Sequence, residues 1–432
     1  MKVAVVGLWH LGSVTAACLA SAGHSVTGLD PDPQVVANLK LGKPPLFEPG
    51  LEELVKSGLS AGRLSFSTHA AEAVPGADVV WITYDTPVDE NDVADTQSVT
   101  HAVESLFAHL SPGTLVLVSS QLPVGTIRRL EEAFRSAFPE KAVTFGYSPE
   151  NLRLGKAIGV FMQPDRVVVG VRTEADRSKV KSLLAPITDR IEFMSVESAE
   201  MTKHALNSFL AVSVTFINEI ATLCEHVGAD AKEVERGLKT EQRIGPKAYL
   251  GPGAAFAGGT LARDVAFLQT LGQSLEIETP LMDGIRASND RHKEWANRRL
   301  CETLGDLDAK RIAILGLTYK PGTDTLRRSS AVELARALAF SGAAVVAFDP
   351  AVKSLPSDLS GIALANSAAA AINGANAVVL ATEWPEFRDL RQDVFLTLAA
   401  PRVILDATSF LLKTLPDLPK LSGVRYLSVG RP

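Results

Sequence analysis

The chain has 432 residues, of which 46% are hydrophobic and 21% are charged. This length exceeds one ordinary hydrophobic core, so we expect two or three domains, and the composition argues against wholesale disorder. Lys and Arg total 43 against 49 Asp and Glu, which gives a formal net charge of -6. A mildly acidic chain is a poor candidate for a nucleic-acid partner, although a local basic pocket for a phosphorylated metabolite remains compatible with it.

The three cysteines, Cys18, Cys224 and Cys301, lie far apart and form no Cys-x-x-Cys or Cys/His cluster. This spacing disfavours a structural metal site, and a sparse, odd count is typical of a reducing cytoplasm, where we expect the protein. No uninterrupted apolar run reaches the roughly 20 residues that span a membrane, so we expect no membrane partner.

The N-terminal segment has the pattern of a βαβ unit. We expect a buried strand over 2–6, a small-residue helix over 13–22 and a second strand over 25–29 that ends at Asp30. A secretory signal is the alternative interpretation, but glycines and a histidine interrupt its apolar region, and a strand–turn–helix explains them better.

Further apolar strand patterns at 79–83, 115–119 and 166–171 alternate with helical stretches, which predicts a mostly parallel sheet covered on both faces. Residues 196–230 have helical spacing and predict one or two long helices. Residues 251–264 are expected to form a Gly/Ala-rich loop.

A second α/β unit begins near Lys310, because Lys310–Leu317 repeats the pattern of the first strand and turn. The fold class is therefore expected to be α/β, with two Rossmann-like doubly wound domains joined by a central helical segment. The expected domains are 1–195, 196–298 (with the loop 251–264) and 299–432.

The first turn resembles the Gly-x-Gly-x-x-Gly fingerprint of dinucleotide sites, with Gly7 and Gly12 in the first and third positions. Trp9 replaces the middle glycine, where its indole either crowds the pyrophosphate, folds away or stacks on the ligand. Asp30 stands where an acid binds the ribose hydroxyls and favours NAD over NADP. The alternative is a Rossmann-like domain that binds no dinucleotide.

Many runs in the same order resemble the UDP-glucose/GDP-mannose dehydrogenase family over nearly the whole chain. They include Phe47-Glu-Pro-Gly-Leu51, Pro123-Val-Gly-Thr126, Ser148-Pro-Glu-Asn-Leu-Arg153, Lys203-His-Ala-Leu-Asn207, Pro252-Gly-Ala-Ala-Phe256, Arg263-Asp264 and Lys320-Pro-Gly-Thr-Asp324. The resemblance implies a homodimer that oxidises C6 of a nucleotide sugar to a carboxylate with two NAD⁺, in polysaccharide biosynthesis. A cysteine captures the intermediate aldehyde as a thiohemiacetal, and a thioester is then hydrolysed.

The resemblance also implies the roles of individual residues. Lys203 and Asn207, four apart on one helical face, stabilise the developing oxyanion, and Asp264 and Glu150 manage protons and water. A solvated helix charge is the alternative for Lys203.

The nucleophile is absent, because Thr260 occupies the family's cysteine position and no other cysteine lies nearby. A hydroxyl is a far weaker nucleophile than a thiolate near neutral pH, so Thr260 is either a weak catalytic group or a small packing residue. Leu154 and Gln121 replace a Glu and a Thr used by the family. The groups for thioester chemistry are thus missing, while those for alkoxide stabilisation remain.

The same resemblance implies two binding groups. The expected cofactor-binding residues are Gly7, Trp9, Gly12, Asp30, Thr86, Gln121, Arg263 and Arg327, with NAD as cofactor. The expected substrate-binding residues are Arg243, Tyr249, Phe256, Gly258, Gly259 and Lys320. Interdomain salt bridges are the alternative role for Arg327 and Lys320.

Three functions stay open at the level of sequence. The first is an NAD-dependent dehydrogenase of a nucleotide sugar, with UDP-hexose favoured, that stops after one two-electron oxidation or acts at a ring carbon. The second is a full 6-dehydrogenase that makes a uronic acid without a thioester. The third is a non-catalytic nucleotide-sugar-binding protein or an epimerase that retains NAD.

Overall fold

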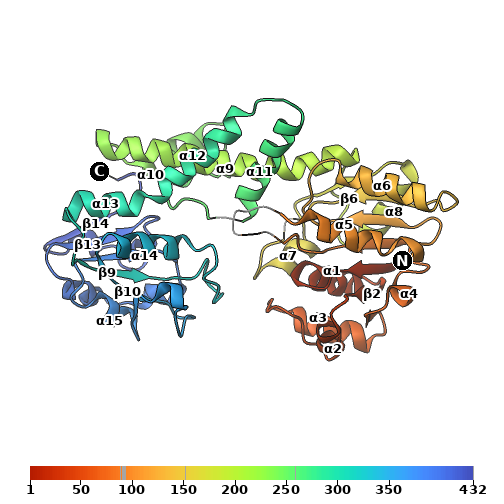
Figure 1. Cartoon of the computed structure of the whole chain (residues 1–432), viewed down its shortest axis with the longest axis horizontal. Helices are drawn as coiled ribbons and strands as arrows, with labels where there is room; N and C mark the ends of the chain where they lie inside the picture. Colours follow the sequence, from red (N-terminus) through yellow and green to blue (C-terminus); the bar gives the residue numbers. More distant parts are fainter. Residues whose placement is uncertain (88, 90–93, 151, 258, 432) are drawn as a thin grey trace. The chain divides into compact units, whose positions relative to one another are not determined.

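The structure is a computed structural model that describes residues 1–87, 89, 94–150, 152–257 and 259–431. The chain forms two compact units, Met1–Leu206 and Asn207–Pro432, and the division falls within helix α9 (Val196–Val227). Each unit holds one α/β sheet (Figure 1). The predicted fold class, two parallel-sheet domains joined by a helical segment, is confirmed.

The sheet of the first unit has the strand order β3-β2-β1-β4-β5-β6-β7-β8. Its first six strands follow the doubly wound order of dinucleotide-binding folds. Neighbouring strands are parallel except β6 and β7, which pair antiparallel. The strands are β1 (Lys2–Val6), β2 (Ser25–Leu29), β3 (Leu64–Ser67), β4 (Val79–Ile82), β5 (Leu115–Val118), β6 (Thr144–Tyr147), β7 (Val167–Gly170) and β8 (Ile191–Met194).

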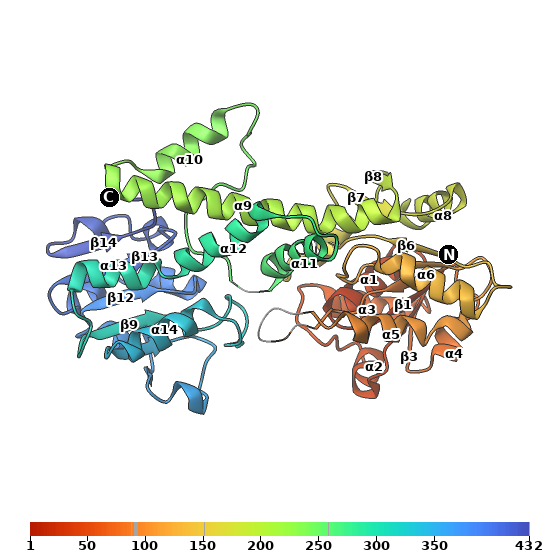
Figure 2. The same ribbon diagram turned by 45° about the horizontal axis from the view of Figure 1, so that its top comes forward.

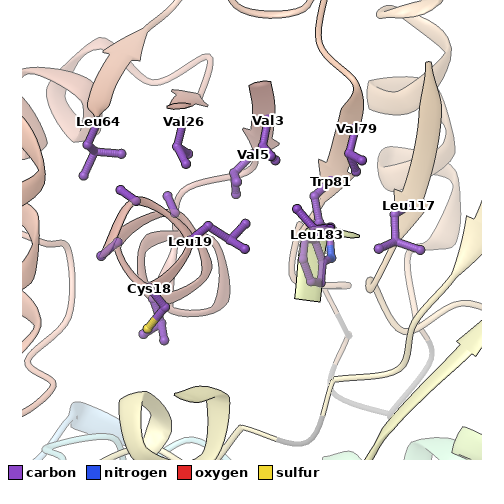
Figure 3. Packing of buried hydrophobic residues seen from close by; sticks show 14 of the residues in the cluster. Val3, Val5, Cys18, Leu19, Val26, Leu64, Val79, Trp81, Leu117 and Leu183 are labelled. Carbon is purple, nitrogen blue, oxygen red and sulfur yellow. The ribbon is translucent and has the colours of Figure 1, made fainter. Parts of the chain in front are cut away.

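Helices cover both faces of this sheet, so its strands are apolar on both sides. They are α1 (His10–Ser21), α2 (Pro33–Lys40), α3 (Leu51–Ser60), α4 (Ala70–Ala73), α5 (Thr96–Glu104), α6 (Thr126–Ala137), α7 (Ala157–Met162) and α8 (Glu174–Leu184), with a 3₁₀ turn at Phe107–His109. On one face, Leu19 of α1 lies on the side of the helix toward Val5 and Trp81, whereas Cys18 lies on the opposite side of the helix (Figure 3). All four residues belong to the same buried cluster.

Helix α1 begins at His10, three residues before the expected start at Ser13. The helix can begin early because Gly12 lies against the preceding turn: a Cβ at this position would lie 1.8 Å from the carbonyl oxygen of Gly7. A residue without a side chain is therefore required where the helix and the turn meet.

The sheet of the second unit has the order β11-β10-β9-β12-β13-β14, and all its pairs are parallel. This is again the doubly wound order. The strands are β9 (Arg311–Leu315), β10 (Ala344–Phe348), β11 (Ala363–Leu364), β12 (Ala377–Leu380), β13 (Arg402–Asp406) and β14 (Val424–Leu427).

The helices of the second unit are α10 (Ala231–Thr240), α11 (Thr260–Ser274), α12 (Pro280–Lys293), α13 (Trp295–Leu304), α14 (Ser330–Phe340) and α15 (Ala368–Ile372). Five 3₁₀ turns lie at Ser357–Leu359, Pro385–Asp389, Gln392–Thr397, Leu411–Lys413 and Leu418–Lys420. Helices α9, α11 and α12 pack together through Ala211, Val265 and Ile285 (Figure 2).

The expected loop over 251–264 is shorter than predicted, because α11 begins at Thr260. Gly259 ends the loop with φ +110°, a conformation that L side chains rarely adopt, and the residues from Thr260 onward continue as helix. Thr260, Arg263 and Asp264 are therefore helical residues rather than loop residues.

Within the described residues, α9 is long and apolar enough to cross a membrane by length and composition. Its most apolar 18-residue window has a mean hydropathy of 1.4, and 44% of that window is buried. Core helices of soluble proteins have the same character, so this helix is weak evidence for a membrane span.

Candidate active site

The first candidate site is the turn after β1. Gly7 has φ +89°, and a Cβ there would lie 2.6 Å from the ring of Tyr84. Only glycine fits a turn with this backbone and this neighbour. The turn leads into the N-terminus of α1, where unpaired backbone N–H groups favour a phosphate group.

Asp30 lies directly after β2 and beside this turn. Its Oδ2 atom accepts a hydrogen bond of 2.7 Å from the backbone N–H of Leu8, and its Oδ1 atom accepts one of 3.0 Å from Asp32. Burial and the negative charge of Asp30 raise the pKa of Tyr84 to about 12. Asp30 remains partly exposed, so its carboxylate is accessible to a ribose hydroxyl.

In the second unit, the acid at the position equivalent to Asp30 is buried. Gly316 has φ +88°, like Gly7, and Asp349 follows β10 as Asp30 follows β2. However, the Asp349 carboxylate is 2% exposed and accepts hydrogen bonds from Leu317, Thr318 and the indole of Trp384. The two Rossmann-like sheets thus differ at the position that recognises ribose, and the first unit alone of the two offers an accessible acid there.

Trp9 stands at the N-cap of α1 and its side chain is 46% exposed. The next residue, His10, contacts the buried carboxylate of Glu48 at 3.0 Å. Glu48 also accepts hydrogen bonds from the N–H groups of Gly155 (2.7 Å) and Ala157 (2.8 Å). Glu48 therefore fixes the start of α1 to the start of α7.

Thr86 and Gln121, expected on the cofactor, lie together after β4 and β5. The Thr86 hydroxyl donates a hydrogen bond of 2.7 Å to the carbonyl of Gln121. The structure thus brings these two residues to the same edge of the first sheet, beyond the carboxyl ends of its strands, which is where ligands bind in such folds.

Lys203 is 7% exposed, and its ammonium donates a hydrogen bond of 2.6 Å to the backbone carbonyl of Glu150. Burial argues against the alternative in which Lys203 is a solvated helix charge. The carboxylate of Glu150 accepts a hydrogen bond of 2.6 Å from Leu152 and is partly exposed. The loop after β6 and helix α9 are therefore joined through these two expected catalytic residues.

Asn207 follows Lys203 by one helical turn of α9 and is 5% exposed. Its side-chain amide donates a hydrogen bond to the carboxylate of Asp264 on α11, which is completely buried. Two expected catalytic residues from different helices are thus in direct contact, as a bonded and desolvated pair.

Thr260 is the first residue of α11 and is exposed. Across the described residues, no recorded hydrogen bond joins its hydroxyl to a histidine, a lysine or a carboxylate. A threonine needs such a base to act as a nucleophile.

The loop before α11 is held by three buried side chains that the sequence did not single out for this role. Asn218 accepts a hydrogen bond from Gly253, His292 donates to the carbonyl of Gly253, and Asn289 forms a reciprocal pair with the backbone of Phe256. Burial lowers the pKa of His292, in keeping with a neutral ring that donates through Nε2. Such partners come from α9 and α12, and no local sequence signal marks them.

The remaining expected substrate residues lie in the second unit, and most are accessible. Arg243 is exposed and paired with Glu241 at 2.9 Å, Tyr249 is 59% exposed, and Lys320 is exposed. A Cβ on Gly259 would lie 3.7 Å from the hydroxyl of Tyr319, so the loop approaches the segment that carries Lys320. Gly258 lies outside the described residues. Arg263 is partly buried on α11, and Arg327 is exposed before α14.

The fold and the glycine turns define an α/β protein with two Rossmann-like sheets, and comparison with known proteins gives the family. Sequence profiles of the UDP-glucose/GDP-mannose dehydrogenase family match in chain order: the NAD binding domain over residues 1–188, the central domain over 197–291 and the UDP binding domain over 313–413.

Relatives match along the whole chain. A UDP-glucose 6-dehydrogenase of Rhizobium meliloti (strain 1021) is 36% identical over 440 residues and covers 100% of both chains. One from Pseudomonas aeruginosa is 33% identical over 452 residues, covering 100% of this chain and 98% of the relative. The solved structure of a UDP-glucose dehydrogenase from the archaeon Pyrobaculum islandicum matches with a TM-score of 0.86 and 30% identity, covering 100% of this chain and 98% of that one.

The chain belongs to the UDP-glucose/GDP-mannose dehydrogenase family. It is accordingly an NAD-dependent oxidoreductase of nucleotide sugars, and NAD is its cofactor. The residues of the first unit fit this cofactor, because the Gly7 turn leads into the N-terminus of α1 and Asp30 is accessible at the ribose position.

Proposed function

We propose that the protein oxidises a UDP-hexose by a single two-electron step. The observation behind this proposal is that the residues expected to stabilise an alkoxide are present, whereas the expected nucleophile is absent. Lys203, Asn207 and Asp264 are buried and bonded, whereas the resemblance implies that Thr260, at the start of α11, stands where the family has its nucleophilic cysteine. Alkoxide stabilisation is retained in this arrangement, and covalent capture of an aldehyde is not.

The proposed step removes a proton from the sugar hydroxyl and a hydride from its carbon, and leaves a carbonyl. NAD, when bound, supplies the hydride acceptor. Lys203 and Asn207 donate hydrogen bonds to the oxygen as it becomes an alkoxide. Glu150 accepts or relays the proton, and Asp264 orients the Asn207 amide through their hydrogen bond.

We assign Thr260 no nucleophilic role. Its hydroxyl is exposed at the first position of α11 and lacks a recorded base among the described residues. Without a thiolate, the carbonyl product has no covalent tether, so it leaves the site at the aldehyde or ketone level.

The proposed binding residues fall into two groups. For NAD they are Gly7, Trp9, Gly12, Asp30, Thr86, Gln121, Arg263 and Arg327. For the nucleotide sugar they are Arg243, Tyr249, Phe256, Gly258, Gly259 and Lys320. Cationic side chains and backbone N–H groups of these kinds bind phosphate oxygens.

Full oxidation to a uronic acid is the second candidate, and one observation favours it: both relatives described above are named UDP-glucose 6-dehydrogenases. Such a reaction needs a second hydride transfer from the hydrated aldehyde, without a thioester.

We further propose a cytoplasmic homodimer that serves polysaccharide biosynthesis, organised as domains 1–195, 196–298 and 299–432. Exposed apolar residues on α9, among them Phe209, Phe216 and Leu223, support pairing through this helix.

The test is incubation of the purified protein with NAD⁺ and a panel of UDP- and GDP-hexoses, with NADH followed by absorbance and NAD binding by calorimetry. We expect NADH formation with a UDP-hexose. Micromolar NAD binding without NADH from any sugar would contradict a net oxidation and favour the epimerase, whereas the absence of NAD binding would favour a non-catalytic protein.

A further inference from the structure

The N-terminus of α6 is capped by a side chain from another helix. Gly125, the N-cap residue of α6, has φ +87° and no side chain with which to cap the helix. Glu200 of α9 supplies the cap: one carboxylate oxygen accepts a hydrogen bond of 2.7 Å from Gly125, and the other accepts one of 3.1 Å from Ile127. Both bonds satisfy helix N–H groups that have no partner within α6.

Glu200 is completely buried, so this contact is shielded from water. Burial raises the pKa of Glu200, and the hydrogen bonds from Gly125 and Ile127 oppose this rise. Removing one acceptor leaves a buried N–H without a partner. The contact is therefore a strong constraint on the position of α9 against α6.

The same face of α9 carries further contacts one turn later. The ring of His204 donates a hydrogen bond of 3.0 Å to the carbonyl of Leu122, and Lys203 donates one of 2.6 Å to the carbonyl of Glu150. Residues three and four apart on a helix share a face, so Glu200 lies directly before Lys203 and His204. These contacts bind α9 to the loops after β5 and β6.

We infer that Glu200 is a positioning residue that sets the register of Lys203 by anchoring α9 to the N-terminus of α6. This inference rests on the proposed function of Lys203. Displacing a catalytic group by about 1 Å can slow a reaction by up to about a hundredfold, and the loop that Glu200 holds carries Gln121 and Leu122 as well.

Two matched variants test the inference, Glu200→Gln and Glu197→Gln. Both remove one carboxylate from the first turns of α9, but Glu197 pairs with the partly exposed Arg172, at 2.9 Å, rather than with α6. With NAD⁺ and UDP-glucose, we expect E200Q to lower kcat by about tenfold with KM within about twofold, and E197Q to match the wild type in both.

A double-mutant cycle separates positioning from a general loss of structure. If Glu200 acts through Lys203, E200Q lowers kcat in the wild-type chain but adds little in a Lys203→Arg background. Equal losses in both backgrounds, or a wild-type kcat for E200Q, would overturn the inference. A fully active K203R together with a fully active E200Q would overturn the assigned role of Lys203 as well.

Hydrogen–deuterium exchange gives a readout that needs no turnover. Amides of residues 121–127 are expected to exchange faster in E200Q than in E197Q or the wild type, whichever sugar is the substrate. Unchanged exchange in E200Q shows that Glu200 does not hold the loop and contradicts the inference. Faster exchange in a protein that oxidises no UDP- or GDP-hexose means that the anchor stands while the proposed function fails.

Discussion

Trp9 is the residue that most clearly distinguishes this cofactor turn from the usual fingerprint. Its side chain is 46% exposed at the N-cap of α1, whereas Trp81, Trp295 and Trp384 are each less than a tenth exposed. The middle glycine of the fingerprint permits close backbone approach to the pyrophosphate. An indole at this position therefore has either to contact the bound cofactor or to hinder it.

We expect Trp9 to contact NAD, because its exposed ring is free to lie along the ligand. Binding of NAD⁺ should then quench the long-wavelength part of the tryptophan emission, and Trp9→Phe should abolish that change. Titration by fluorescence and calorimetry measures both effects. If Trp9→Gly bound NAD⁺ more tightly than the wild type, the indole would be an obstruction and the expectation would be wrong.

Thr260 provides a second prediction at this scale. Because its exposed hydroxyl bonds to no histidine, lysine or carboxylate within the part of the chain that the structure describes, Thr260→Ala should keep the rate of NADH formation within about threefold. Lys203→Met should lower that rate by about a hundredfold or more. Initial rates with the same UDP-hexose compare the two. An inactive, folded T260A protein would show that the hydroxyl takes part in the reaction.

Among the elements, the pairing of α1 with α7 depends on one buried carboxylate. Burial opposes ionisation of Glu48, but the His10 ring and the N–H groups of Gly155 and Ala157 prevail and lower its pKa below the ordinary value near 4.5. Because the pKa of Glu48 is lower in the folded state than in the unfolded state, its ionised carboxylate stabilises the fold at pH values above the unfolded-state pKa. That stabilisation is lost as the pH falls through the lower, folded value.

We therefore expect Glu48→Gln to reduce the free energy of unfolding by about 1–3 kcal/mol at neutral pH, because hydrogen bonds to a charged group are replaced by weaker ones. The difference from the wild type should shrink below about pH 4.5. Urea unfolding at several pH values measures it. A difference that stays constant through the acid range would contradict the role of the charge.

The elements that the sequence predicted well are those whose pattern is local and buried. The strands over Lys2–Val6 and Ser25–Leu29 were placed at their observed bounds, since the first is an apolar run that ends at Gly7 and the second ends at Asp30. Strands β3, β6 and β8 of the first sheet were not predicted. Strands β3 and β8 lie at the two edges of the sheet, whereas β6 lies inside it, so position in the sheet alone does not explain the three misses.

The candidate site could likewise be predicted from the sequence only where the pattern is local. Helical spacing sufficed to put Lys203 and Asn207 one turn apart on α9. It could not show that Asn289 holds Phe256 or that Glu200 caps α6, because these contacts join segments 33 and about 75 residues apart. The start of α11 was placed too late, since the glycines before Thr260 favoured a longer loop.

In the whole molecule, α9 carries an apolar stripe that the described chain does not cover. Phe209, Phe216 and Leu223 recur every seven residues and are 69%, 46% and 61% exposed. A seven-residue repeat keeps side chains along one side of a helix, the pattern by which two helices pair. A second copy of the chain is the partner that we propose.

We expect the wild type to sediment as a dimer and the double variant Phe209→Glu/Leu223→Glu as a monomer, because charges on this stripe cannot be buried without a partner. Phe340→Glu is the control, since Phe340 is 96% exposed on α14 and away from the stripe. Analytical ultracentrifugation measures the mass of each variant in solution and distinguishes a dimer from a monomer. A double variant that remains dimeric would refute pairing through α9, and binding of the wild type to lipid vesicles would point to a membrane instead.

The most direct measurement is the number of NADH molecules formed per UDP-hexose consumed, with the product identified by mass spectrometry. Without a cysteine at position 260, we predict one NADH and a product that has lost two hydrogen atoms and is trapped by a carbonyl reagent. Two NADH per sugar, with a carboxylate product that no carbonyl reagent traps, would contradict the single oxidation and establish the full route to a uronic acid.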